Sequence, residues 1–172
     1  EIRYLVQEDE SRETFTYYPG NGFSKNSVAK TQTICLDSRK YNTVAYNIDD
    51  NNYFKLRDIA QILNGTIKTF DVKYDGATNS IDMLSFYDYT SVGGELTPGD
   101  DVTRTAFSSS ASLTLDGVPI KATCYNIDGN NYFKLRDITD ALDCRVEWDD
   151  NNQLIWVVPS VPAYDDPNEA VG

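Results

Sequence analysis

The string YNIDDNNYFKLRDI starts at Tyr46 and returns as YNIDGNNYFKLRDI from Tyr125, with thirteen of its fourteen letters identical. Self-similarity at a fixed spacing is typical of a duplicated structural unit. At the same offset of 79 residues, Leu36 falls on Leu115. After the string the first copy is five residues longer, and the copies align again at an offset of 74. The chain is therefore predicted to contain two copies of one unit.

The duplication predicts how the 172 residues are organised. The predicted parts are an unassigned N-terminal extension (1–29), a first unit (30–92), a linker (93–108), a second unit (109–165) and a tail (166–172). The linker segment is rich in Gly, Ser, Thr and Asp, a composition typical of loops and linkers. Units of about 60 residues are near the lower limit for independent folding, so we expect the two units to contact each other.

The first half of each unit has the alternating apolar pattern of β-hairpins. In the second copy, Asp116-Gly117 predicts a two-residue type I′ turn between strands. The apolar parity then shifts between Ala122 and Tyr125, which predicts a bulge or a strand break. A second turn at DGNN leads into a strand whose Phe133 is expected to face inward.

The second half of each unit begins with a helical pattern. At Asp137 the apolar period changes from two to about 3.6, with Ile138, Ala141 and Leu142 on one stripe. Asp137, like Asp58 in the first copy, is predicted to cap the helix N-terminus. Two further strands are expected after each helix. The predicted fold class is α+β, with two tandem copies of a small antiparallel β-sheet packed on one short α-helix.

Composition excludes several classes of function. The chain has 27 acidic and 15 basic residues, a net charge of −12 and no histidine. The lack of clustered Lys and Arg argues against nucleic acid or anionic lipid as a partner. The lack of histidine excludes a Ser-His-Asp triad, a Cys-His dyad and a histidine-ligated metal centre within this chain. No run approaches the ~18 apolar residues of a membrane span, so no membrane insertion by this segment is expected.

Three cysteines, Cys35, Cys124 and Cys144, include no CxxC pair, so a thiolate zinc site is not expected. Cys124 aligns with Ala45 of the first copy, which indicates a small buried residue. A Cys124–Cys144 disulfide stays open as an alternative if the chain is secreted. No cofactor is predicted.

The repeated string has oxygen-bearing side chains at the spacing of a calcium loop, positions 1, 3, 5 and 12. They are Asn47, Asp49, Asn51 and Asp58 in the first copy, and Asn126, Asp128, Asn130 and Asp137 in the second. The glycine that such a loop needs at position 6 is replaced by asparagine, and a strand pattern occupies positions 7–10. Turn and capping chemistry explains the same residues. No metal site is predicted, and calcium-dependent adhesion is kept as the alternative.

The string YNIDGNNYFKLRDI, followed by an apolar helix, VEWD and a final apolar strand, resembles the copper amine oxidase N-terminal-like (stalk) domains. These occur in tandem on secreted and cell-wall proteins of Gram-positive bacteria. The resemblance covers about residues 30–165. It implies an antiparallel sheet curled on a helix, an extracellular location and an accessory role in adhesion, wall association or spacing. Copper and quinone chemistry belongs to a separate, histidine-bearing catalytic domain that nothing here matches.

The leading functional hypothesis is a non-catalytic extracellular or cell-surface interaction or spacer module. Its expected partner is a cell-wall polymer, a glycan or another surface protein, with Trp156, Tyr53 and Tyr132 as candidate ligand or interface contacts. A carboxylate-based glycosidase is the weaker hypothesis, because the repeated acidic residues fall in turns and helix caps. No catalytic residue is predicted, and the chain is not expected to be an enzyme.

Overall fold

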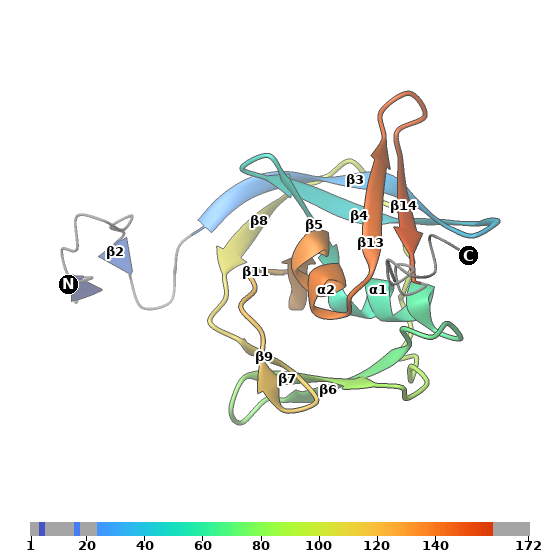
Figure 1. Cartoon of the computed structure of the whole chain (residues 1–172). Coiled ribbons are helices and arrows are strands. Elements are labelled where there is room, and N and C mark those ends of the chain that lie inside the picture. The colour runs from blue at the N-terminus through green and yellow to red at the C-terminus, as the bar shows by residue number, and fades with distance from the viewer. Residues whose placement is uncertain (1–3, 6–15, 18–23, 160–172) are drawn as a thin grey trace, which may run out of the picture.

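Figure 1 shows the computed structural model of the chain, which describes residues 24–159 and the short pairs 4–5 and 16–17. The described part of the chain is mainly β, with 52% of it in strands and 11% in two helices. The helices are α1 (Leu56–Leu63) and α2 (Leu135–Ala141). The strands are β1 (Tyr4–Leu5), β2 (Thr16–Tyr17), β3 (Ser24–Leu36), β4 (Arg39–Ile48), β5 (Asn51–Lys55), β6 (Phe70–Asp75), β7 (Ser80–Ser85), β8 (Thr103–Ser108), β9 (Ser112–Leu115), β10 (Val118–Pro119), β11 (Cys124–Ile127), β12 (Asn130–Lys134), β13 (Arg145–Asp149) and β14 (Leu154–Val158).

Six strands close into a barrel in the order β3–β4–β5–β12–β11–β8, because β3 also pairs with β8. Closure pairs the edges that an open sheet would leave exposed. Alternate residues of these strands form one apolar cluster. Because successive side chains of a strand point to opposite faces, this cluster lies inside the barrel. Its members are Ala29, Val44, Tyr46, Ile48, Tyr53, Ala106, Tyr125, Ile127 and Tyr132.

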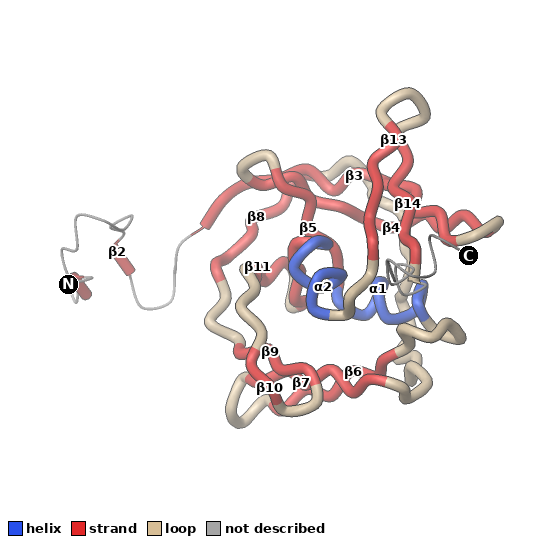
Figure 2. The backbone as a smooth tube through the Cα atoms, in the orientation of Figure 1, coloured by secondary structure: helices blue, strands red, loops and turns tan. Residues whose placement is uncertain are grey.

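Outside the barrel, the two copies exchange strands. Strand β7 of the first copy pairs in parallel with β9 of the second, and β14 of the second pairs in parallel with β3 of the first. The registers match, since Ile81 lies opposite Leu113 and Ile155 lies opposite Ile34, which are corresponding repeat positions. A second sheet follows with the order β10–β9–β7–β6, visible below the barrel in Figure 2. Each copy therefore completes its outer sheet with a strand of the other copy.

The barrel has an internal pseudo-twofold axis between β5 and β12. These strands pair antiparallel with Phe54 opposite Phe133, and both side chains are fully buried. The ring of Tyr46 packs edge-to-face on Tyr132, and Tyr53 packs in the same way on the second-copy Tyr125, each at 5.1 Å between centroids. Equivalent residues of the two copies thus make equivalent contacts across the axis.

The predicted fold class is wrong: the chain does not form two small sheets, each packed on one helix. It forms one closed barrel shared by both copies and a second sheet. The hairpins and helices were placed nearly correctly along the chain, but alternation says which residues share a face and not which strand lies alongside. Tyr53, expected to contact a ligand or an interface, is also buried, because it points into the barrel while Phe54 packs in the outer core.

Two local predictions in the second copy are confirmed. Asp116 and Gly117 both have positive φ, 51° and 80°, as a type I′ turn requires. Strand β10 ends at Pro119 and β11 begins only at Cys124, which is the expected break. In the first copy, β4 runs through the equivalent positions without interruption.

The helix caps differ from the prediction. The helices begin at Leu56 and Leu135, so Asp58 and Asp137 lie within the first turn. The residue before each helix is a lysine that makes no side-chain capping bond. The strand passes directly into the helix, and the aspartates use their carboxylates to fix other segments, as described below.

The segment 93–108, expected to be a linker, contains strand β8 of the barrel. It runs so close to β3 that a Cβ on Gly99 would lie 2.3 Å from the carbonyl carbon of Lys30. Arg104 of β8 forms an ion pair with Asp128 at 2.7 Å, and its repeat counterpart Lys25 pairs with Asp49. The structural repeat therefore extends back to residues 24 and 103.

All three cysteines are buried and unbonded, which fits the small buried residue expected at Cys124 and gives no Cys124–Cys144 bond. Burial raises the pKa of both Cys124 and Cys144 to about 11, so neither thiol is ionised at neutral pH. Neither helix in the described part of the chain is long and apolar enough to cross a bilayer.

Candidate functional site: a pocket between the two copies

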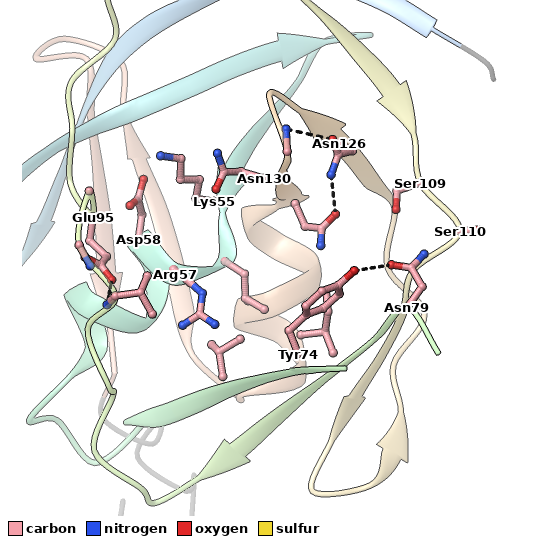
Figure 3. Close-up of a pocket in the computed structure, with 18 of the residues that line it drawn as sticks. Lys55, Arg57, Asp58, Tyr74, Asn79, Glu95, Ser109, Ser110, Asn126 and Asn130 are labelled. Atoms are coloured by element: carbon pink, nitrogen blue, oxygen red, sulfur yellow. Dashed lines mark hydrogen bonds between the residues drawn. The ribbon is translucent and has the colours of Figure 1, made fainter. Parts of the chain in front are cut away.

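A cavity of about 470 Å³ opens between the two copies, on the outside of the barrel (Figure 3). We call it the Arg57 pocket. Its walls come from the β5–α1 junction, the β6–β7 hairpin, the connector around Gly93, the β8–β9 break and the β11–β12 turn. The lining residues are Lys55, Leu56, Arg57, Asp58, Val72, Tyr74, Asn79, Ile81, Val92, Gly93, Gly94, Glu95, Ser108, Ser109, Ser110, Asn126, Gly129, Asn130 and Asn131. Such a volume is within the range of small-ligand sites.

The junction of β5 and α1 supplies two cations to this pocket. Leu56 is buried in the core, and its neighbours Lys55 and Arg57 line the cavity. Arg57 donates from Nη1 to the Tyr89 hydroxyl at 3.3 Å, with its guanidinium 5.9 Å from the ring centroid. The Lys55 ammonium group forms no hydrogen bond or ion pair with another described residue, although its charge acts on Asp58. The pocket therefore has a fixed guanidinium beside an ammonium group.

The opposite wall is the asparagine-rich turn of the second copy. The Asn126 side chain accepts from the Gly129 N–H at 3.2 Å and donates to the Asn131 side-chain oxygen at 3.4 Å. Asn130 donates to the Asp128 carbonyl at 3.4 Å. These bonds orient the amides, and the Asn131 amino group and the Asn130 oxygen keep hydrogen-bonding capacity. The side chains that matched a calcium loop thus form a polar wall.

An aromatic ring completes the pocket. Tyr74 of β6 is 54% exposed, and its hydroxyl donates to the Asn79 side-chain oxygen at 3.3 Å. Asn79 has a φ of 49° in the β6–β7 turn, a conformation that asparagine tolerates well. Figure 3 shows Tyr74 and Arg57 reaching toward the same space. A ring, oriented amides and cations around one cavity can bind a ligand that has both apolar faces and many polar groups.

Asp58 also lines the pocket but faces the protein. Its side chain is fully buried and accepts from the Leu96 N–H at 2.9 Å and from the Thr43 hydroxyl. Burial raises the pKa of Asp58, and these two hydrogen bonds offset the rise only in part. This carboxylate ties the connector to the first turn of α1.

Glu95 holds the connector in a tight turn. It accepts from the backbone N–H groups of Val92 and Gly93 at 2.7 and 2.9 Å, and from the Tyr89 hydroxyl at 2.7 Å. Burial works to raise the pKa of Glu95, but the bonds from Tyr89 and Val92 outweigh it and lower the pKa to about 2. The pKa of Glu95 is thus lowered while that of Asp58 is raised. Opposite shifts of this kind are found in catalytic acid–base pairs. The oxygens of both carboxylates, however, already accept hydrogen bonds from protein donors. Asp58 and Glu95 are therefore arranged to stabilise the connector.

The residues predicted as contacts lie elsewhere. Tyr53 and Tyr132 are 3% exposed, and their rings join the two copies inside the barrel. Trp156 is half-buried on β14, opposite Cys35 of β3, at the junction of the copies. None of the three lines the Arg57 pocket.

Sequence reasoning missed the residues that do line the pocket. A usable signal was present in Lys55 and Arg57: both recur unchanged in the second copy although neither fits the apolar pattern. The partnership of Arg57 with Tyr74 and Asn130 had no such signal, because it arises from three separate segments.

The described part of the chain contains no group of three His, Cys, Asp or Glu side chains that could hold a metal ion. Within the first calcium-like loop, Asp49 pairs with Lys25 while Asp58 accepts from Leu96 and Thr43. The two carboxylates of that loop therefore have different partners. Calcium-dependent adhesion stays the alternative, and a test of it is given in the Discussion.

No family model, no curated protein and no solved structure matches this chain. The resemblance to copper amine oxidase N-terminal-like domains therefore stays a prediction based on the repeated string.

Proposed function

We propose that this protein is a non-catalytic, extracellular or cell-surface binding module that holds a segment of glycan in the Arg57 pocket. The observation that carries the proposal is the convergence of an exposed ring, Tyr74, with the oriented amide of Asn130 and the guanidinium of Arg57. Sugars have apolar ring faces and rims of hydroxyl groups, so this combination suits them. The extracellular location rests on the resemblance.

The surroundings of the acidic residues in the pocket favour a binding function over hydrolysis. A glycosidase needs two carboxyl groups placed on either side of the scissile bond and free to exchange protons. Asp58 has no exposed surface, and Glu95 is saturated by four donors, including the Ser91 hydroxyl at 3.0 Å. The pocket thus offers recognition groups without a suitable acid–base pair.

The test is isothermal titration calorimetry against soluble peptidoglycan fragments, chitin oligomers, uronic acid oligomers and neutral xylo-oligosaccharides. We expect binding of at least one class, weakened about tenfold or more by Tyr74→Ala, which corresponds to ~1.4 kcal/mol. Tyr87→Ala is the matched control, because Tyr87 is 63% exposed and lies outside the pocket.

Two results would contradict the proposal. One is the absence of binding to every glycan class. The other is release of shortened products from any of these oligomers, detected by mass spectrometry, which would show that the protein is a hydrolase.

A further inference from the structure

A second cavity, of about 200 Å³, lies across the pseudo-twofold axis from the Arg57 pocket. We call it the Arg136 pocket. Its walls include Lys134, Arg136, Trp148 and the turn 50–52. At the repeat offsets of 79 and 74 residues, each has a counterpart in the first cavity: Lys55, Arg57, Tyr74 and the turn 129–131. In both pockets the cations come from one copy and the turn from the other, so a single copy cannot form either one.

The side chains of the two turns are oriented by the same bonds. Asn47 donates to the Asn52 side-chain oxygen at 3.1 Å, which repeats the bond from Asn126 to Asn131. Asn51 donates to the Asp49 carbonyl at 3.0 Å, as its counterpart Asn130 does in the second copy. Two amides of the Arg57 pocket wall, Asn130 and Asn131, are thus reproduced by Asn51 and Asn52 in the Arg136 pocket, where Asp50 stands in place of Gly129.

The ring and the cations of the Arg136 pocket are at least partly accessible to solvent. Trp148 is 43% exposed, and its indole N–H donates to Asp150 at 3.1 Å, which fixes the ring. Arg136 is exposed and has no ion pair with another described residue, and Lys134 is half-buried. Core packing therefore gives no reason for these cations.

The cations recur within the repeated string, whereas the residues that precede the string mostly differ between the copies. Of the ten residues 36–45 and their counterparts 115–124, two pairs are identical, Leu36/Leu115 and Asp37/Asp116. Even a buried position differs, with Ala45 replaced by Cys124. Folding explains why Phe54 and Leu56 recur, because both are buried, and Arg57 also contacts the buried Tyr89. The described residues give no such contact for Lys134 and Arg136. A shared ligand chemistry explains why the same pair of cations stands in both pockets.

We propose that the Arg136 pocket is a second subsite for the same ligand, and that the ligand is a repeating acidic glycan with a carboxylate on its sugar units. This proposal rests on the proposed function. A guanidinium can hold a carboxylate with two parallel hydrogen bonds, and an indole or phenol ring can pack on the sugar face. Two subsites on one rigid barrel raise the apparent affinity for a polymer over that for a short piece.

The net charge of −12 argues against a general electrostatic attraction between this protein and an acidic glycan. A protein with this charge repels polyanions from most of its surface, so the attraction must come from local groups. Binding of an acidic glycan is therefore evidence for the two cation pairs rather than for a general electrostatic effect.

The test compares galacturonic acid oligomers of about two and about ten units by calorimetry on the whole chain. We expect two dimer sites per chain, and for the decamer an affinity about tenfold or more above that of the dimer. Neutral xylo-oligosaccharides of the same lengths should bind at least about tenfold more weakly, because they offer no carboxylate to Arg57 and Arg136.

Arg136→Gln and Trp148→Ala should each reduce the dimer stoichiometry from two to one and remove the gain with length. Arg57→Gln, in the Arg57 pocket, should likewise reduce the dimer stoichiometry from two to one and remove the gain in affinity with length. Arg39→Gln, an exposed arginine outside both pockets, is the control, and thermal melting verifies that each variant is folded.

The outcomes separate the two proposals. One dimer site in the wild type, lost in Arg57→Gln and unchanged in Arg136→Gln, overturns the second subsite and leaves the proposed function standing. Equal binding of neutral and acidic oligomers overturns the acidic ligand. No binding of any glycan overturns the proposed function itself.

Discussion

The two copies share a string of fourteen nearly identical residues, yet they fold differently around it. In the first copy, β3 and β4 form one long hairpin that runs from the barrel into the outer sheet. In the second copy the corresponding hairpin is divided, so that β8 and β11 lie in the barrel while β9 and β10 lie in the second sheet. The string thus forms the same hairpin of the barrel in both copies, and the flanking residues decide how the chain leaves the barrel.

The division also affects the pockets. Where β8 and β9 separate, Ser108, Ser109 and Ser110 line the Arg57 pocket, and the connector at Gly93 adds a further wall. In the first copy, β3 is continuous at the equivalent positions and none of them lines the Arg136 pocket. The larger cavity is therefore on the side where the hairpin is broken.

The largest expected effect tests whether the two copies are one folding unit. We expect the separate fragments 24–98 and 99–159 to lack cooperative unfolding, because β7 and β3 each find parallel partners in the other copy. Mixing the fragments should restore the far-UV circular dichroism spectrum and a single melting transition. A fragment that melts cooperatively alone would show that the copies are independent domains.

The next effect tests the symmetry of the axis. Phe54→Ala and Phe133→Ala should each cost about 3–5 kcal/mol of unfolding free energy, because both side chains are fully buried. Chemical denaturation should show one transition for both variants. Phe107→Ala, at a residue that is 42% exposed, is the control and should cost much less. Two separate transitions in either variant would contradict a shared core.

A smaller effect tests the connector. Asp58→Ala should cost about 1–3 kcal/mol of unfolding free energy, because the Leu96 N–H loses its acceptor. Asp58→Asn keeps an acceptor and should cost less. Because the folded-state pKa of Asp58 is raised above 3.8, its contribution favours the folded state at low pH and declines as pH rises through the raised pKa. Denaturation from pH 3 to 8 should therefore show less loss of stability with rising pH in Asp58→Asn than in the wild type.

The smallest expected effect concerns calcium. If the two asparagine-rich turns serve as pocket walls, excess calcium followed by chelator should leave the melting temperature unchanged within about 1 °C. A ligand that binds the folded state alone raises the melting temperature. A reversible rise of several degrees, absent in the double variant Asp49→Ala and Asp128→Ala, would establish the calcium alternative.

Local chemistry was readable from the sequence in several places. Asp116-Gly117 predicts its turn because both positions require positive φ, and the apolar parity predicts the break before Cys124. The helices were placed within three residues, but their caps were not predicted, because Asp58 and Asp137 find partners in Leu96 and Thr123 that are distant along the chain. The Arg57 pocket could not be predicted for the same reason, since its cations and its amide wall belong to different copies.

The sequence by itself determined the duplication, the turns, the short helices and the absence of histidine chemistry, because each depends on residues that are close in the chain. Only the tertiary structure decided that the copies share one barrel and exchange their outer strands. Strand pairing depends on which edges meet in space, and the side-chain alternation of a strand is the same for any partner. The repeated string therefore marked a unit, and the fold showed that the unit is built, with both of its pockets, from two copies together.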